Sequence, residues 1–232
     1  MFQVVHSDSR GAADHGWLRA KHTFSFGDYR NPEMMGFSSL RVINEDRIEP
    51  SQGFGTHPHK DMEIVTYIIQ GALEHKDSMG NGSVIEAGDV QRMTAGTGVF
   101  HSEFNHSEED KVHLLQIWIL PRENSLSPGY EQQHFDRVDK LNQWRLVASG
   151  DGRDSSMTVH QAVDLYASVL DVGNELLHEF PADHSGYLQV VGGSITANDE
   201  TLEAGDGVAI RELESLTVRA TSDAEMILFD MA

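Results

Sequence analysis

The sequence predicts an all-β protein made of two tandem β-barrels. Three observations lead to this prediction. β-Branched and aromatic residues gather in short segments bounded by Gly, Asn, Asp or Pro, no long stretch repeats its apolar residues every 3.6 positions, and one motif occurs in both halves. A chain of 232 residues is long enough for one large or two small hydrophobic cores. The clearest strand segments are 38–50, 62–77, 111–120, 187–198 and 224–231.

The repeated motif is Glu-Ala-Gly-Asp, which occurs in segments 84–93 and 201–210. Each copy follows a glycine-containing turn and a short strand, so the shared context favours duplication of a whole β domain. The stretch between the halves is polar and rich in turn residues. We therefore predict an N-terminal barrel over 1–125, a connecting segment over 126–158 and a C-terminal barrel over 159–232.

Histidines that could bind a metal lie mainly in the first half. In the stretch GTHPHKDME, His57 and His59 are separated by one residue, and side chains at i and i+2 of a strand point the same way. Pro58 fits a strand edge, where its missing N–H costs little. His101 and Glu103 repeat the spacing after a glycine-rich approach. Two such pairs on neighbouring strands predict a site of three histidines and one carboxylate.

The carboxylate of this site has two candidates on the pattern alone. Glu63 has the same strand parity as His57 and His59, so spacing does not separate it from Glu103. A set of nitrogen and oxygen donors suits Fe, Mn, Co, Ni, Cu or Zn, and open coordination positions would accept a substrate. The second half contains no His-x-His, so we expect its barrel to lack the metal ligands.

Composition restricts the remaining possibilities. Only 17 Lys and Arg residues face 37 Asp and Glu residues, which gives a net charge of −20. Because nucleic-acid affinity depends on basic side chains that neutralise phosphates, we expect no direct binding of DNA or RNA. No apolar run approaches the roughly 20 residues of a membrane span, and the N-terminus has no signal-peptide pattern. We expect a cytoplasmic protein without membrane attachment, and a monomer.

The quoted motifs resemble the pirin family of the cupin superfamily, in particular the bacterial pirin-like proteins with quercetinase activity. The resemblance covers most of the chain and is strongest over HTFSFGDY, MGFSSLRVINED, GFGTHPHKDMEIVTYIIQG, HKDSMGN and MTAGTGVFHSE. It implies a bicupin, in which two jelly-roll barrels pack face to face and only the N-terminal barrel binds a metal. It also implies the ligand set His57, His59, His101 and Glu103, and so favours Glu103 over Glu63.

The resemblance implies a metal-dependent dioxygenase that cleaves flavonols such as quercetin with O2 and releases CO. Iron(II) is the metal it favours, and Glu103 would act as both ligand and base. Phe54, Met62 and Phe100 flank the ligands, and we expect them to wall the substrate pocket. The alternative is a metal-dependent regulatory protein that senses the redox state of its metal and has no flavonol substrate. A cupin isomerase is a third possibility, and it would be indifferent to oxygen.

Overall fold

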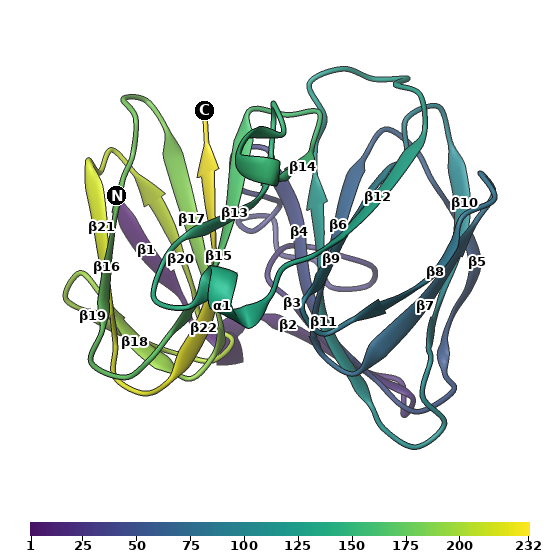
Figure 1. The fold of residues 1–232 in the computed structure, drawn as a ribbon, viewed down its shortest axis with the longest axis horizontal. Coiled ribbons are helices and arrows are strands. Elements are labelled where there is room, and N and C mark those ends of the chain that lie inside the picture. Colours follow the sequence, from purple (N-terminus) through teal and green to yellow (C-terminus); the bar gives the residue numbers. More distant parts are fainter. The chain divides into compact units, whose positions relative to one another are not determined.

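Strands dominate the computed structural model, which describes residues 1–232 (Figure 1). The chain forms two compact units, each with its own pair of sheets. The N-terminal unit comprises residues 11–134 and 159–161, and the C-terminal unit comprises residues 1–10, 135–158 and 162–232. These features confirm the all-β prediction and the presence of two similar β domains.

In the N-terminal unit, a seven-stranded sheet has the order β12-β9-β6-β11-β4-β3-β2 and a four-stranded sheet has the order β5-β10-β7-β8. All of these strands pair antiparallel. Their bounds are β2 Gly11–Asp14, β3 Leu18–His22, β4 Leu40–Ile48, β5 Gly53–His59, β6 Glu63–Gln70, β7 Ala72–Asp77, β8 Gly82–Glu86, β9 Asp89–Thr94, β10 Val99–Asn105, β11 Val112–Ile119 and β12 Gly129–His134.

The C-terminal unit has sheets of the same sizes, of order β1-β20-β17-β22-β15-β13-β14 and β16-β21-β18-β19, with one parallel pair, β13 and β14. None of its helices is long and apolar enough to cross a membrane. Its elements are β1 Phe2–Val5, η1 Ser7–Ser9, α1 Arg137–Lys140, β13 Arg145–Ser149, η2 Arg153–Ser155, β14 Met157–Thr158, β15 Val163–Leu170, β16 Glu175–Glu179, β17 Ser185–Gly192, β18 Ser194–Ala197, β19 Glu200–Glu203, β20 Gly207–Arg211, β21 Ser215–Ala220 and β22 Ala224–Met231.

The division of strands between the two units does not follow their order in the sequence. The first strand of the chain, β1, pairs with β20 in the C-terminal unit, and β12 occupies the matching place beside β9 in the N-terminal unit. The segment 126–158, for which we expected only a connection, thus supplies β12 to one unit and α1, β13 and β14 to the other. The sequence of β12, GYEQQH, is polar and half-buried, so it lacks the apolar alternation by which a strand is recognised.

The two Glu-Ala-Gly-Asp copies form the same turn. In each, the aspartate carboxylate accepts a hydrogen bond from the backbone N–H of the glutamate, at 3.0 Å for Asp89 and Glu86 and at 3.0 Å for Asp206 and Glu203. Gly88 and Gly205 have φ angles of 99° and 90°, a region that favours glycine. The turns join β8 to β9 and β19 to β20, so they identify equivalent strands in the two units.

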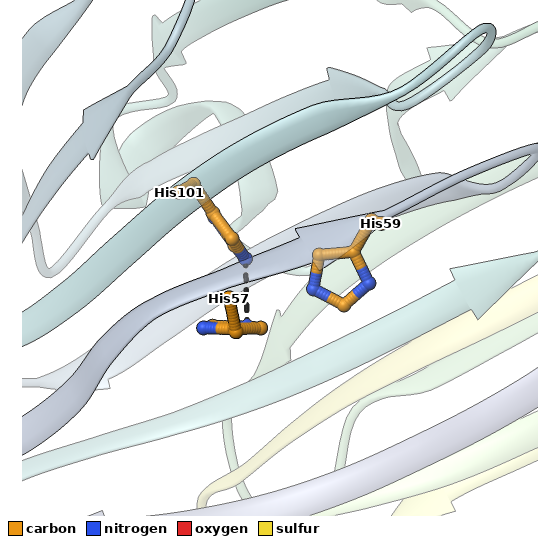
Figure 2. A group of neighbouring side chains, drawn as sticks. All are labelled: His57, His59 and His101. Carbon is orange, nitrogen blue, oxygen red and sulfur yellow. Dashed lines mark hydrogen bonds between the residues drawn. The ribbon is translucent and has the colours of Figure 1, made fainter.

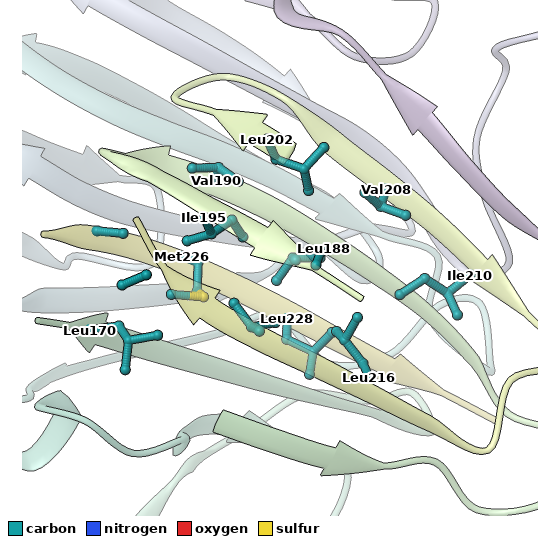
Figure 3. Packing of buried hydrophobic residues seen from close by; sticks show 14 of the residues in the cluster. Leu170, Leu188, Val190, Ile195, Leu202, Val208, Ile210, Leu216, Met226 and Leu228 are labelled. Atoms are coloured by element: carbon teal, nitrogen blue, oxygen red, sulfur yellow. The ribbon is translucent and has the colours of Figure 1, made fainter. Parts of the chain in front are cut away.

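The interiors of the two units differ in character. The C-terminal unit is filled by a continuous apolar cluster between its two sheets (Figure 3). In the N-terminal unit, the apolar clusters around Ile68 and Met93 occupy only part of the interior. Buried polar side chains, among them His75, His101 and Glu103, fill much of the rest. Since buried polar groups are costly unless they are partnered, this difference marks the N-terminal unit as the place to look for chemistry.

Candidate metal centre

The strand β5 is an edge strand with a bulge beside the candidate site. It pairs only with β10, which gives Pro58 the edge position that its missing N–H requires. His101 pairs with His57 and Glu103 pairs with Phe54, so two steps along β10 match three steps along β5. A bulge of this kind re-aims side chains. Here it leaves the ring of Phe54 6.3 Å from that of His57.

Three imidazole rings converge at this point (Figure 2). The ring centroids of His57 and His101 lie 4.5 Å apart, and His59 lies 4.8 Å from each of them. One nitrogen from each ring falls within 4.8 Å of the others. The structure therefore brings together the three histidines that were predicted, from their spacing on two strands, to form one site.

The nitrogen positions fit a transition-metal ion. The Nδ1–H of His57 donates to the carbonyl oxygen of Gly55 at 2.8 Å, which leaves Nε2 without a proton, as in most metal-binding histidines. The Nε2 atoms of His57 and His101 are 3.0 Å apart. Two ligands at right angles on an ion about 2.1 Å away would be separated by about 3.0 Å. The Nε2 of His59 is buried with no hydrogen-bond partner, as expected of a ligand atom.

The local environment keeps the imidazoles of His59 and His101 neutral. Burial, followed by the nearby His57, lowers the pKa of His59 to about 4. The same causes, burial first and then His57 and His59, hold the pKa of His101 far below its ordinary value. Because a metal binds the neutral imidazole, low pKa values leave the ligand atoms available at neutral pH.

Glu103 is buried next to His101 and is held by one amide. The Nε2 of Gln116 donates to both carboxylate oxygens, at 3.0 Å to Oε1 and 2.8 Å to Oε2. Burial raises the pKa of Glu103, while the hydrogen bonds from Gln116 favour the charged form and oppose the rise. The carboxylate lies within 4.8 Å of nitrogens of His75 and His101.

Glu63, the other candidate carboxylate, is fully buried but has different neighbours. The hydroxyl of Thr94 donates to its Oε2 at 3.1 Å, and the backbone N–H of His160 lies 3.4 Å from the same atom. The Nδ1 of His160 is 3.3 Å from Oε1. Glu63 belongs to no cluster of potential metal ligands, whereas Glu103 clusters with His101 and His75. These contacts support Glu103 as the carboxylate ligand, which we retain as a proposal.

Two cavities in the N-terminal unit are lined by residues that contact the candidate centre, although none of the proposed ligands lines either of them. The large chamber has a volume of about 400 Å³ and the small chamber about 260 Å³. The large chamber adjoins His57 through Phe54, and the small chamber adjoins His59 through Trp118, whose ring lies 4.9 Å from that of His59. Their principal walls are Ala13, Ala20, His22, Phe26, Asn44, Asp46 and Phe54 for the large chamber, and Phe26, Arg41, Met62 and Trp118 for the small chamber.

The predicted pocket residues are thus found in two places. Phe54 lines the large chamber and Met62 the small one. Phe100 lines neither and is 56% exposed. Its neighbour His101 points inward, and the alternation of side chains along β10 turns Phe100 to the outer face. The expectation that Phe100 walls the pocket is therefore corrected.

Three residues beside the centre were not assigned a role from the sequence. Gln116 and Trp118 lie two residues apart on β11 and so share a face, but this strand is buried on both faces and has no alternating pattern that would have indicated them. His75 is fully buried, with its ring 5.3 Å from that of His101 and its Nε2 3.2 Å from a carboxylate oxygen of Asp77. It therefore belongs to the surroundings of the three clustered histidines.

The C-terminal unit has one histidine at an equivalent position and apolar residues at the others. Counting along the paired strands from the matching turns, His178 faces Leu216 as His57 faces His101. Phe180 and Val218 replace His59 and Glu103 in the same count. The Nε2 of His178 instead lies 2.9 Å from a carboxylate oxygen of Asp230. The repeated strands fold without the histidine cluster, so folding of this type of domain does not require the ligands.

Comparison with known proteins places this geometry in a wider context. The family model described as Pirin matches residues 4–119, and the model described as Quercetinase C-terminal cupin domain matches residues 146–231. A quercetin 2,3-dioxygenase of Escherichia coli K12 is 48% identical over 231 residues, which cover 100% of this chain and 99% of the relative. A pirin-like protein of Caulobacter vibrioides is 39% identical, with 97% of each chain covered.

Solved structures agree with the sequence comparison. A bacterial pirin of Escherichia coli in complex with nickel(II) superimposes with a TM-score of 0.95 at 47% sequence identity. The match covers 100% of this chain and 99% of that chain. A quercetin 2,3-dioxygenase of Acinetobacter baumannii shares the fold, with a TM-score of 0.79 at 23% identity.

Proposed function

The chain belongs to the pirin family of the cupin superfamily, and on this premise we propose that it is a metal-dependent dioxygenase of flavonols such as quercetin. The reaction would consume O2 and release CO. The observation that carries the proposal is the convergence of His57, His59 and His101 beside the buried carboxylate of Glu103. The name of the Escherichia coli relative supports the choice of substrate.

The proposed ligands are His57, His59, His101 and Glu103. This donor set accepts most first-row divalent ions, and iron(II) is our choice from the resemblance to the pirin family. Zn, Mn, Co, Ni or Cu would also fit the donors, and a bacterial pirin has been solved with nickel(II). When bound, the ion would act as a Lewis acid that lowers the pKa of the flavonol 3-hydroxyl.

The residues around the substrate would then each have a separate role in the reaction. Glu103 would accept the proton of the 3-hydroxyl at a carboxylate oxygen, since burial raises the pKa of this group and makes it a better base. The amide of Gln116 would keep the carboxylate in place during this transfer. Trp118, stacked edge-on against His59, would exclude water from one side. His57 would keep its Nε2 directed at the centre through the hydrogen bond to Gly55.

Gas exchange with quercetin tests the proposal. Iron-loaded protein should consume O2 and release CO in equal amounts, and His101→Ala should abolish both because the ligand set is broken. A protein that kept its metal but neither consumed O2 nor released CO would refute dioxygenase activity. In that case the alternative is the metal-dependent regulator, which predicts a partner complex that changes with the oxidation state of the metal.

A further inference from the structure

The large chamber exists because small side chains lie beside large ones. Ala13 pairs with Ala20 across β2 and β3, and neither side chain fills the space in front of the sheet. The aromatic residues Phe26 and Phe54 line the same cavity. Aromatic walls with a few polar groups are typical of cavities that bind small planar ligands.

Two sets of contacts connect the wall of the large chamber to the candidate centre. The first is Phe54, whose ring lies 6.3 Å from that of His57. The second is a row of polar residues across the seven-stranded sheet. Asn44, in the chamber wall, pairs in register with Gln116, and Gln116 donates to both oxygens of Glu103. Paired residues on one face lie about 5 Å apart at Cβ, so the chamber begins one side chain away from the proposed base.

The polar groups of the large chamber suit a hydroxylated ring. His22 and Asn44 are both buried, and the Nδ1 of His22 lies 2.8 Å from the Oδ1 of Asn44. The buried carboxylate of Asp46 lines the same cavity. These groups offer hydrogen-bond acceptors and donors within an aromatic enclosure, which is the combination that a polyphenol ring requires.

Phe26 is the wall between the two chambers. Apart from its neighbour Gly27, it is the only residue that lines both. Its ring lies 5.3 Å from that of His22 on one side and 5.3 Å from that of Trp118 on the other. A tight turn holds its backbone, with reciprocal hydrogen bonds of 3.1 and 2.9 Å to Tyr29. Arg41 anchors the preceding residue, Ser25, by donating to its carbonyl oxygen at 2.9 Å.

We propose that the large chamber binds the phenyl ring of the flavonol, with any hydroxyl groups that it carries, and that Phe26 limits the size of this ring. The proposal rests on the proposed function for the identity of the ligand. The volume of the large chamber lies in the lower part of the range of about 300–1,000 Å³ found for ligand cavities, and the volume of the small chamber lies below this range. Removal of the Phe26 ring would join the two chambers and admit a larger ring system.

Binding without turnover tests this proposal. Nickel-loaded protein without oxygen would be titrated by calorimetry with 3-hydroxyflavone and with its analogue that carries a naphthyl group in place of the phenyl ring. Ala20→Phe fills the large chamber and should weaken binding of 3-hydroxyflavone by tenfold or more, with metal content unchanged. Phe26→Ala should shift the ratio of the two Kd values about tenfold in favour of the naphthyl compound. Phe100→Ala, an aromatic truncation on the outer face, is the matched control and should change neither Kd.

Unchanged binding of 3-hydroxyflavone by a folded Ala20→Phe protein would overturn the proposal. An unchanged Kd ratio in Phe26→Ala would overturn it as well, and this variant decides the matter if Ala20→Phe does not fold. Wild-type protein that binds flavonol without releasing CO in air would refute the dioxygenase function and leave the chamber assignment standing. Wild-type protein that binds neither compound would refute both.

Discussion

Replacement of Gln116 by leucine should weaken metal binding, because this residue holds Glu103. The substitution keeps most of the side-chain volume and removes the amide that donates to both carboxylate oxygens, at 2.8 and 3.0 Å. Hydrogen bonds to charged groups contribute about 1.5–3 kcal/mol. Loss of a group that orients a metal ligand lowers metal affinity by about 10–100-fold, or about 1.4–2.8 kcal/mol. The two ranges agree, so we expect a metal Kd raised by about 10–100-fold.

Competition with a chelator of known affinity would measure this Kd in wild type and variant. Gln91→Leu is the matched control, because Gln91 is also buried in the same sheet, where Thr66 of β6 separates it from Gln116, and it donates no hydrogen bond to Glu103. A Kd for Gln116→Leu within twofold of the Gln91→Leu value would refute the role of the amide and, with it, the assignment of Glu103 as a ligand that needs orienting.

Three further predictions concern the same region. Elemental analysis should show that Glu103→Ala has lost most of its bound metal. Glu63→Ala should keep its metal and lose only stability, since the partners of Glu63 are Thr94 and His160. The reverse pattern would overturn the choice of carboxylate. Because the pKa of His59 is lowered to about 4, the unfolded apoprotein binds more protons than the folded form between pH 4 and about 6.5. The apoprotein's Tm should therefore fall as pH decreases through this window and not depend on this group above it, and a Tm that rises on acidification would contradict the sign. In Gly53→Ala, a Cβ would lie 2.2 Å from the carbonyl oxygen of Glu103, so we expect a loss of about 1–3 kcal/mol in unfolding free energy and weaker metal binding. In the control Gly82→Ala, the atom nearest to the new Cβ would be 3.9 Å away. Denaturant and chelator titrations should therefore show no change in stability or metal binding for this control.

The parts of the site that are set locally could be predicted from the sequence. His57 and His59 share a face because strand side chains alternate, and the same rule applies to His101 and Glu103. The same rule predicts the position of Phe100. Because Phe100 is next to His101 in the strand, its side chain faces outward. The repeated Glu-Ala-Gly-Asp turn was recognisable because its conformation depends on its own glycine and aspartate.

The parts that depend on pairing between distant strands could not be predicted. The bulge that brings Phe54 towards His57 arises from the register of β5 against β10, which neither strand encodes alone. The hydrogen bonds that Gln116 donates to Glu103 connect opposite sheets of one unit. The placement of β1 beside β20 depends on an edge at the far end of the chain, and four residues carry too little pattern to specify it.

Anomalous diffraction at the absorption edge of the metal, from crystals of metal-loaded protein, tests the central claim most directly. The claim predicts one peak in the N-terminal unit, about 2.0–2.2 Å from one nitrogen each of His57, His59 and His101 and from an oxygen of Glu103. An ion bound to Glu63, or an ion bound to His75 in place of His57 and His59, would contradict it.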